Sequence, residues 1–457
     1  MGPKAVLTEP GEPQPAKKGV EASRADSVSR SGWRALGASW FGWMFDGYET
    51  YALVLVMGTA VGELLAPDQR LPMSVYIGGL LTATLLGWAI GGIVAGVLAD
   101  YIGRKRMLML SILWYAVAAG LTALAGDYWS LLALRFLTGL GLGGEWGPGA
   151  ALVSEFWPVL LRGRAAAVLQ AAFGVGFFAA SAVWLFVHTL GPSSWRYMFV
   201  IGILPALLLL YIRRGVHDPP LWVAADKRRR EARERALSGG PAVRSDHELL
   251  QFTMFRVLSD AELRRRLALL IVMSLSTIVG WWSVATWIPQ YAGQLAAKGE
   301  QDPQYWSSLA GLLYNSGSIA GYLVFGLLAD IWGRKPTIWI YYLGALGLSL
   351  SLFLLVRDPR QLLFVAAVNG FFTNGQFAWM PVYLPELFPT AVRGSAISLV
   401  FDSSRLVAAL GPLMTGWLIS SLGGLETAAA VMSLIYVLGL IVTPFAAPET
   451  RGNPLPA

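Results

Sequence analysis

The chain has 457 residues, of which 55% are hydrophobic and 14% charged, and its formal net charge is +7. Soluble proteins carry about 25% charged residues, so this composition excludes an ordinary water-soluble domain and indicates that lipid faces much of the surface. The absence of cysteine excludes disulfides and thiolate metal sites. The basic residues fall in alternate loops between apolar runs, and we therefore expect no nucleic-acid partner.

Residues 1–32 are rich in Pro, Lys, Ser and Glu. They have no apolar core, so we predict a disordered tail that lacks a signal peptide. A membrane-spanning helix needs about 20 apolar residues. Twelve candidate runs follow, at about 34–62, 75–98, 107–126, 129–153, 165–188, 196–212, 267–292, 305–328, 337–356, 361–384, 394–420 and 425–446.

Lys and Arg accumulate in alternate loops between these runs, and such loops are cytoplasmic in membrane proteins. An even number of spans then places both termini in the cytoplasm. The sequence predicts a six-helix bundle over 33–213, a central cytoplasmic loop over 214–266, a second six-helix bundle over 267–446 and a cytoplasmic tail over 447–457. The central loop contains KRRREARER at 227–235, which favours short amphipathic helices lying on anionic lipid.

Two motifs occur twice, and the two copies of each lie about half the chain apart. Gly96–Arg106 reads GVLADYIGRKR, and Gly326–Pro336 reads GLLADIWGRKP. The run EFWP at 155–158 is followed by an Arg-Gly pair, and the run ELFP at 386–389 is followed by the same pair. The separation between copies is nearly identical for the two motifs. Such a match indicates an internal duplication, which is typical of transporters built from two repeats.

Two six-span halves, a GxLAD-x-x-GRK loop after spans 2 and 8, and a long central loop resemble the major facilitator superfamily from residue 34 onward. The resemblance implies an all-α membrane protein with two pseudo-symmetric halves around a central cavity. We expect a multi-pass protein of the cytoplasmic membrane that works as a monomer by alternating access. Neither a cofactor nor a metal is expected.

Shorter signals resemble several branches of this superfamily. Asp46-Gly47-Tyr48-Glu49 is similar to a motif of aromatic acid:proton symporters, with Glu in place of a second Asp. The run GGEW at 143–146 is similar to sialate and monocarboxylate:proton symporters. The run RFLTGLG at 135–141 and the ending PETRGNPLP at 448–456 look like sugar and organic-ion porters. These signals agree on organic-acid carriers as a neighbourhood but not on one subfamily.

Ionisable residues inside a membrane are costly and usually face a cavity or a partner. Asp46 and Glu49 lie three residues apart in span 1, so they share a helix face, where mutual repulsion and burial favour the protonated carboxyl. The resemblance gives Glu49 the place of the proton-coupling acid of sugar porters, and Arg135 that of its arginine partner. Glu145 in span 4 is a further proton candidate, whose counterpart in the other half is Gln376. A fixed structural ion pair is the alternative for each.

Span 11 contains Asp402 and Arg405, whose counterparts in the first half are Ala171 and Gly174. A charged pair present in only one half points to the ligand rather than to the scaffold. Arginine presents a planar fork that matches a carboxylate, and the resemblance to organic-anion carriers assigns such an arginine to the substrate. The alternatives are that Asp402 only neutralises Arg405, or that Asp402 holds a cationic substrate.

Uncharged polar residues are the remaining candidates for substrate contact, although each also suits a hydrogen bond between helices. They are Gln170, Tyr314, Asn315, Asn374 and Gln376. The three histidines are scattered, so no metal site is expected. The chain has neither a phosphate-binding loop nor a nucleophile elbow, and we do not expect an enzyme.

The doubled motifs place opposite charges at the cytoplasmic ends of the spans. The resemblance implies that they latch this side shut while the outer side is open. The predicted gate residues are Asp100, Arg104, Glu155 and Arg162 in the first half, and Asp330, Arg334, Glu386 and Arg393 in the second.

The sequence therefore predicts a proton-coupled carrier that imports a small organic anion, either a monocarboxylate or an aromatic acid. A sugar:proton symporter and a proton-driven exporter of organic cations or drugs are the alternatives within transport. A membrane sensor or receptor derived from a transporter is the alternative outside it.

Overall fold

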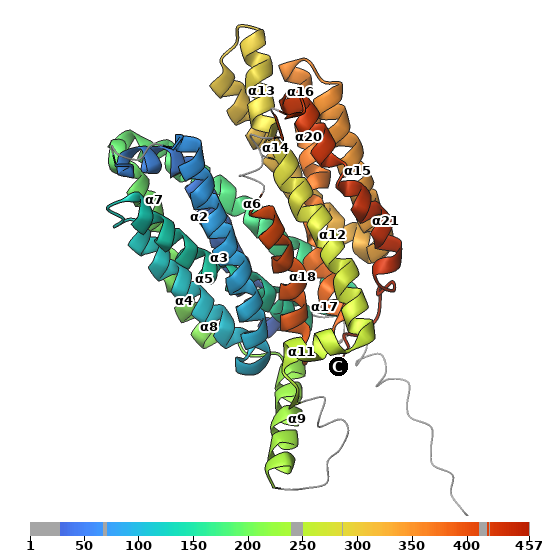
Figure 1. The fold of residues 1–457 in the computed structure, drawn as a ribbon. Helices are drawn as coiled ribbons and strands as arrows, with labels where there is room; N and C mark the ends of the chain where they lie inside the picture. The colour runs from blue at the N-terminus through green and yellow to red at the C-terminus, as the bar shows by residue number, and fades with distance from the viewer. Residues whose placement is uncertain are drawn as a thin grey trace, which may run out of the picture.

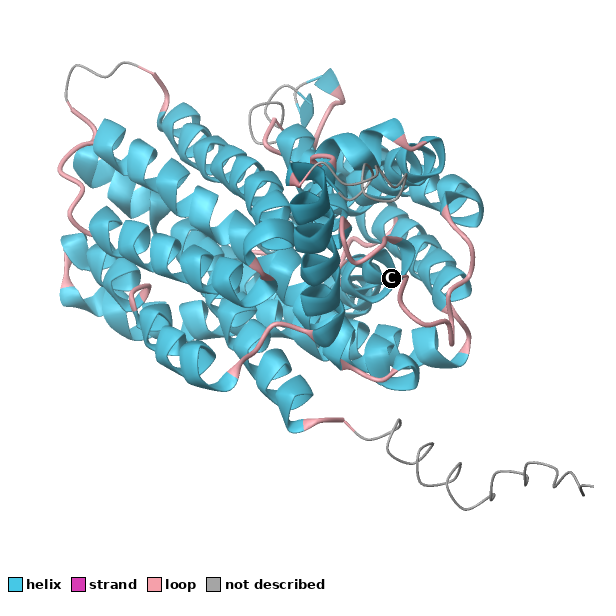
Figure 2. Ribbon diagram, turned by 90° about the horizontal axis from the view of Figure 1, so that it is seen from below, coloured by secondary structure: helices cyan, strands magenta, loops and turns pink. Residues whose placement is uncertain are grey.

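The computed structural model describes residues 28–66, 71–238, 250–285, 287–410, 418–419 and 421–456. Within these residues every regular element is a helix, as the view in Figure 2 shows. Most of the predicted N-terminal tail, 1–27, lies outside the described residues. The first helix already begins at Arg30, inside the predicted tail, because the Ser29 hydroxyl caps it by accepting a hydrogen bond from the Gly32 N–H at 3.0 Å.

The helices form two groups and a connecting segment (Figure 1). The first group consists of α2 (Arg30–Leu64), α3 (Met73–Ile102), α4 (Arg104–Thr122), α5 (Tyr128–Phe156), α6 (Arg162–Val187), α7 (Trp195–Ile201) and α8 (Leu208–Gly215). The connecting segment contains α9 (Pro220–Leu237) and α11 (Thr253–Ser259). The second group consists of α12 (Ala261–Ala285), α13 (Trp287–Lys298), α14 (Pro303–Ile331), α15 (Arg334–Leu354), α16 (Pro359–Thr373), α17 (Trp379–Leu387), α18 (Arg393–Ala408), α20 (Leu425–Ser433) and α21 (Tyr436–Ala446).

Short 3-10 turns link or extend several of these helices. They are η1 (Val159–Leu161), η2 (His188–Leu190), η3 (Pro192–Ser194), η4 (Leu204–Leu207) and η5 (Gly375–Ala378). Eleven of the twelve predicted runs coincide with one helix or with consecutive helices, and the eleventh, 394–420, begins as α18 and lies partly outside the described residues. The tenth, for example, is α16, η5 and α17 in succession.

Seven helical segments of the described chain are long and apolar enough to cross a membrane. The seven do not include α2 and α5, which contain four of the buried charged residues described below. The all-helical prediction is confirmed, whereas the total of twelve spans and the position of the termini stay predictions.

Glycines let helices within each group approach closely. In the first group Gly87 of α3 lies against α5, where a β-carbon would collide with the carbonyl oxygen of Phe136. In the second group Gly317 of α14 lies against α16, where a β-carbon would collide with the carbonyl of Ala367. Gly87 and Gly317 are as far apart along the chain as the two copies of the first doubled motif, so they occupy equivalent positions. Small residues at corresponding contacts therefore give the two groups the same internal packing.

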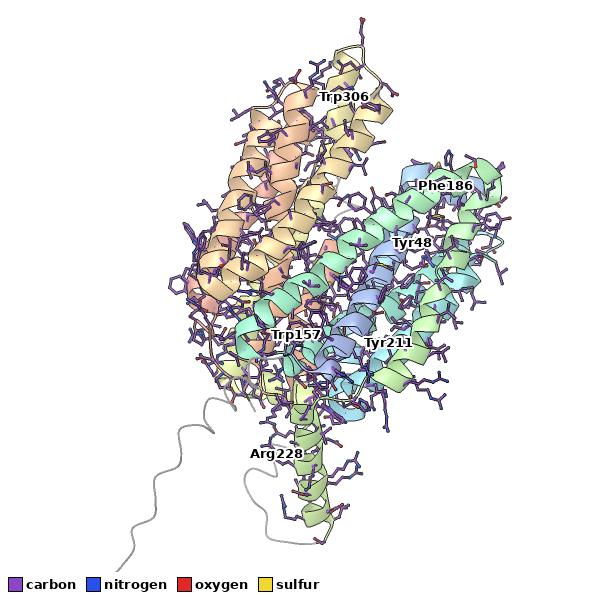
Figure 3. All side chains as sticks on the ribbon, turned by 180° about the vertical axis from the view of Figure 1, so that it is seen from behind. Tyr48, Trp157, Phe186, Tyr211, Arg228 and Trp306 are labelled. Atoms are coloured by element: carbon purple, nitrogen blue, oxygen red, sulfur yellow. The ribbon has the colours of Figure 1, made fainter. Side chains whose placement is uncertain are left out.

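The groups meet along two helix pairs, α3 with α18 and α6 with α14. Their ribbons converge near α11 and α17 and spread apart toward α7 and α13 (Figure 1). We call the converging end, where the loops at Gly103 and Gly333 lie, the motif end. The other end includes the exposed side chains of Phe186 and Tyr305, and Figure 3 labels Phe186 and Trp306 there.

The basic helix α9 belongs to the segment predicted as the central loop. It projects from the motif end in the direction of the membrane helices rather than across them, with Arg228 well away from the bundle (Figure 3). Trp222 Nε1 and Arg229 Nη1 both donate to the Asp100 carbonyl, at 3.1 and 2.8 Å, and Arg229 Nη2 donates to the Ala391 carbonyl at 3.1 Å. These bonds fix the first part of α9 to the motif end, and the contact of this segment with lipid stays a prediction.

Candidate functional site

Six ionisable side chains are buried in the interior of the bundle, and they come from α2, α5 and α18. They are Asp46, Glu49, Arg135, Glu145, Asp402 and Arg405, and none is more than 7% exposed. A charged group costs about 2.5–3.5 kcal/mol at the centre of a membrane helix, so such a concentration marks a functional region.

The first pair joins α2 to α5. Arg135 Nη1 lies 3.3 Å from Glu49 Oε2, and its other terminal nitrogen donates to the hydroxyls of Thr122 and Thr138 at 2.6 and 2.9 Å. The guanidinium also lies over the ring of Phe199, 4.3 Å from its centroid. Glu49 Oε1 has no partner among the described residues. Protonation would therefore cost Glu49 its one ion pair but would leave Arg135 with three other contacts.

The second pair consists of two carboxyl groups, Asp46 on α2 and Glu145 on α5, which interact electrostatically. No hydrogen bond from the described residues reaches any of their four oxygens. Glu145 packs against Gly42, where a β-carbon would collide with the Glu145 carboxyl. Two neighbouring carboxylates repel each other, which favours binding of a proton to one of them.

This pairing differs from what the spacing on α2 predicts. Asp46 and Glu49 lie on neighbouring turns of one helix, but each takes its partner from a different turn of α5. Glu49 meets a cation, whereas Asp46 meets a second acid. The interior therefore contains two separate arrangements of buried carboxyl groups on the same two helices.

The third pair lies on α18, where Arg405 Nη1 is 2.7 Å from Asp402 Oδ1. The guanidinium is enclosed by two rings, Trp88 of α3 at 4.2 Å and Phe401 at 3.9 Å from its carbon to each centroid. The Asp402 carboxylate packs against Gly92 of α3, which has no side chain to displace it. Arg405 also interacts electrostatically with Asp46. The cation thus lies where the two groups of helices meet.

A pocket lies beside Arg405 between the two groups. Including the part open to solvent, its volume is about 490 Å³. Eight of its fourteen lining residues are aromatic, among them Trp43, Trp88, Trp281 and Phe401, and Arg405 is the one charged residue among the described residues that line it. A mostly aromatic wall with one cation suits a small anion that has a flat or apolar body.

The uncharged candidates divide into two sets. Gln170 and Asn374 line the pocket, and each is also hydrogen-bonded, Gln170 to Trp146 Nε1 at 3.2 Å and Asn374 to Ser318 at 2.5 Å. The structure does not bring Tyr314, Asn315 or Gln376 to the pocket wall. The Tyr314 hydroxyl instead bonds to the Thr373 hydroxyl at 2.8 Å, and Gln376 Nε2 donates to the Thr373 carbonyl at 2.9 Å.

The sequence did not predict that the rings of Trp88 and Phe401 contact Arg405. Phe401 precedes Arg405 by one helical turn, and that spacing is the available signal for their contact. Trp88 carries no comparable signal, because it comes from α3, in the other half of the chain.

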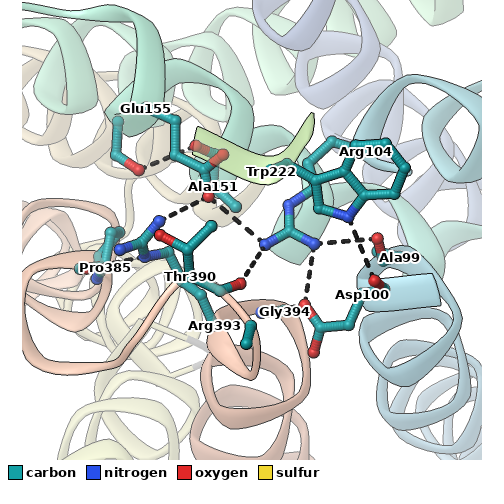
Figure 4. A network of polar contacts seen from close by, with 12 residues as sticks. Ala99, Asp100, Arg104, Ala151, Glu155, Trp222, Pro385, Thr390, Arg393 and Gly394 are labelled. Carbon is teal, nitrogen blue, oxygen red and sulfur yellow. Dashed lines mark hydrogen bonds and ion pairs between the residues drawn. The ribbon is translucent and has the colours of Figure 1, made fainter. Parts of the chain in front are cut away.

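The doubled motifs meet at the motif end in two networks. In the first, Arg104 bonds Asp100 at 2.8 Å and Glu155 at 3.4 Å, and Arg393 from the second group bonds the same Glu155 oxygen at 2.6 Å (Figure 4). The Asp100 carboxylate accepts the backbone N–H groups of Gly394 and Ser395, at 3.0 and 2.9 Å. It thereby caps the start of α18, across the interface between the groups.

The second network repeats the first. Arg334 bonds Asp330 at 3.1 Å and Glu386 at 2.8 Å, and Arg162 from the first group reaches the same Glu386 oxygen at 3.4 Å. Asp330 accepts the Arg164 backbone N–H at 3.2 Å, near the start of α6. All eight predicted gate residues therefore lie in two networks that bridge the groups.

A further doubled contact was missed from sequence. The Asp218 carboxylate accepts the Lys105 backbone N–H at 2.9 Å, and the Glu449 carboxylate accepts those of Arg334 and Lys335 at 2.9 and 3.0 Å. Asp218 and Glu449 are as far apart along the chain as the EFWP and ELFP runs, so that separation was the signal that could have found them.

Comparison with known proteins identifies the family. The model of the sugar (and other) transporter family matches residues 33–457. The chain belongs to this family. A metabolite transport protein of Haemophilus influenzae is 31% identical to this transporter, over 94% of this chain and 99% of that one. The cis,cis-muconate transport protein of Acinetobacter baylyi is 28% identical, over 83% and 87% of the two chains.

The solved structure of the proton:xylose symporter XylE, a major facilitator superfamily protein, shares the fold. Its TM-score is 0.74 at 21% identity, and the match covers 94% of this transporter and 98% of the symporter. The superfamily expected from the doubled motifs is therefore confirmed. This protein is a multi-pass membrane transporter and not an enzyme.

Proposed function

We propose that this transporter is a proton-coupled symporter that imports a small organic anion, a monocarboxylate or an aromatic acid, across the cytoplasmic membrane. The observation on which this rests is Arg405, the one charged residue among the described residues that line the pocket. A guanidinium presents paired N–H donors that match the two oxygens of a carboxylate. The rings of Trp88 and Phe401 would receive the apolar body of the same molecule.

The comparisons support an acid as the cargo. The similar protein of Acinetobacter baylyi is a cis,cis-muconate transport protein, and muconate is an organic acid. A carboxylate that enters the pocket needs a cation, because an unpaired ionised group in a medium of low dielectric is costly. Arg405 supplies that cation.

Two arrangements could take up the driving proton. Glu49 would bind it by giving up its contact with Arg135, and the Asp46–Glu145 pair would bind it because the proton relieves the repulsion between the two carboxylates. Both lie on α2 and α5, in the group opposite the one that holds Arg405. Proton uptake in one group and anion binding in the other would together favour movement of the two groups against each other.

The motif end would be the cytoplasmic gate. Its two networks tie the groups together through Glu155–Arg393 at 2.6 Å and Glu386–Arg162 at 3.4 Å. With this end closed, the pocket would receive its substrate from the other side, where the ribbons of the two groups spread apart (Figure 1). Loading of anion and proton would then open the networks.

Uptake into proteoliposomes tests the proposal. Labelled benzoate, nicotinate and cis,cis-muconate would be offered under an imposed inward proton gradient, with a protonophore to collapse it. We expect uptake of at least one acid that stops when the gradient is collapsed and is lost in Arg405→Ala. Arg360→Ala, which removes an exposed arginine, is the matched control. Uptake that ignores the gradient would contradict proton coupling, and normal affinity in Arg405→Ala would contradict the role of Arg405.

A sugar:proton symporter is the second candidate. The amides of Gln170 and Asn374 on the pocket wall, together with the surrounding aromatic rings, would also suit the hydroxyls and faces of a sugar ring. Labelled xylose in the same vesicles separates the two candidates. Uptake of xylose that persists in Arg405→Ala would favour the sugar.

A further inference from the structure

Asp402 already forms an ion pair with Arg405, the cation that the proposed function assigns to the substrate. Its Oδ1 lies 2.7 Å from Arg405 Nη1, and the two faces of the guanidinium are covered by Trp88 and Phe401. Asp402 is 2% exposed, so its charge is balanced by Arg405 rather than by water. The unloaded pocket is thus neutral at this position without any ligand.

The surrounding charges show what a second carboxylate would meet. Asp46 on α2 interacts electrostatically with Arg405, and Glu145 on α5 contacts Asp46. Glu49 and Arg135 balance each other. Arg405 therefore interacts with two acidic groups, Asp402 and Asp46, and a substrate carboxylate would be the third.

Among the described residues, Arg405 is the one charged group that interacts with Asp402. On α3 the neighbouring residue is Gly92, and Asp100 is bound in the first network. On α12 Arg266 is paired with Glu262 at 2.7 Å, and on α17 Glu386 is bound in the second network. A carboxylate that enters beside Arg405 would leave a buried negative charge unless a proton enters too.

We infer that Asp402 is an internal substitute for the substrate: its carboxylate holds Arg405 in the empty carrier, and it takes up one proton when the substrate anion replaces it. This inference rests on the proposed function. The ion pair Arg405⁺·Asp402⁻, a proton and the anion become the ion pair Arg405⁺·anion and a neutral Asp402 carboxyl. The net charge is zero before and after the exchange. The exchange would couple one proton to one anion at the binding site itself, separately from Glu49 and Arg135.

Asp402 lies at the contact between α18 and the first group of helices, so a change in its charge would affect how these helices pack. Asp402 packs against Gly92 of α3, and one turn away Ser398 packs against Gly96 of α3 and Gly147 of α5. These contacts leave no room for a β-carbon, so α18 and the first group fit closely along this line. Loss of the Asp402 charge would therefore act where the two groups of helices touch.

Chemical rescue tests the inference without knowledge of the substrate. In purified Asp402→Ala, Arg405 lacks its partner, and a small anion should take the vacated place. We expect sodium formate at neutral pH to raise the melting temperature of this variant by at least about 2 °C and to leave the wild type unchanged. The double variant Asp402→Ala/Arg405→Gln is the control and should not respond. An equal response in the double variant, or none in Asp402→Ala, would overturn the inference.

The pH dependence of transport provides a second test with the isosteric Asp402→Asn. The assay uses whichever of benzoate, nicotinate and cis,cis-muconate the wild type takes up. Because each anion binds together with one proton, the apparent affinity of the wild type should weaken by up to about tenfold for each unit by which the pH is raised. We expect the apparent affinity of Asp402→Asn to change less with pH than that of the wild type between about pH 5.5 and 7.5. The variant should therefore still bind the anion at about pH 7.5. An unchanged slope would refute the inference while leaving the proposed function standing. If the wild type takes up no organic acid, the proposed function fails, and formate rescue still decides whether Asp402 holds the place of an anion.

Discussion

The motif end and the interior of the bundle differ in symmetry. At the motif end Asp100, Arg104 and Glu155 have counterparts that make equivalent contacts in the other group. In the interior the acidic pair and the arginine pair each occur in one group only, because Gln376 stands opposite Glu145 and Gly174 opposite Arg405. The duplicated part joins the groups to each other, whereas the unduplicated part has the chemistry to distinguish a ligand.

This difference shows how a duplicated scaffold gains a function. If the two networks form the proposed gate, symmetry suits them, since both must break when the groups separate. A site that binds one anion and one or more protons needs different residues on its two sides. Substitutions in the interior should therefore alter what is transported and how it is driven, and substitutions at the motif end should alter which end is open.

The largest effect is expected at Arg405. Arg405→Ala removes one partner of a buried ion pair and the proposed carboxylate ligand, so the apparent affinity for the transported acid should weaken by about 30-fold or more, which corresponds to at least roughly 2 kcal/mol. Arg405→Lys keeps the charge but not the planar fork and should recover only part of it. Concentration dependence of uptake in proteoliposomes gives both values. Full recovery by lysine would show that charge alone is recognised.

The next effect concerns the energy source rather than affinity. Glu145→Gln removes the acid that faces Asp46 and that we propose as part of the proton site, so accumulation driven by a proton gradient should fall by about tenfold, whereas exchange of labelled for unlabelled acid continues. Glu63→Gln is the matched control, because Glu63 lies in the same group but pairs with Arg196 at the other end. Equal losses of accumulation and exchange in Glu145→Gln would indicate a structural role instead.

A smaller effect, of the same size for both residues, is expected from Glu155 and Glu386, the glutamates of the two networks. Glu155→Gln and Glu386→Gln each remove the charge that holds an arginine of the other group, and each should favour opening of the motif end by about 1–3 kcal/mol. The chain has no cysteine, so Ser398→Cys provides a single label where α18 meets α3. Faster maleimide labelling by a similar factor in both variants would support the symmetric description. Faster labelling in only one of the two variants would show that the two networks are not equivalent.

The smallest effect is expected at the polar residues away from the pocket. Asn315→Ala should change apparent affinity by less than about twofold, because Asn315 is not among the lining residues and such changes usually stay within roughly 0.5 kcal/mol. Gln170→Ala, which alters the pocket wall, should change it by about fivefold. The comparison uses the same uptake assay. A larger effect at Asn315 than at Gln170 would mean that the substrate lies outside this pocket.

Much of the fold was predictable because it depends on local composition and on repetition. Twelve apolar runs indicated the helices, and the matching separations of the two doubled motifs indicated the duplication and all eight residues of the two networks. The candidate site was predictable in part. Charged residues inside apolar runs are rare, so Glu49, Arg135 and Arg405 were evident without coordinates.

The sequence by itself determined which residues are chemically unusual and which positions repeat. Only the tertiary structure decided their partners. Asp46 interacts with Glu145 of α5 as well as with Glu49 of its own helix, and Trp88 of α3 joins Phe401 of α18 against the Arg405 guanidinium. The physical reason is that hydropathy and charge are properties of single residues, whereas pairing depends on how closely helices distant in the chain approach. Here Gly42 and Gly92 set that approach, since their missing side chains are what admit Glu145 and Asp402.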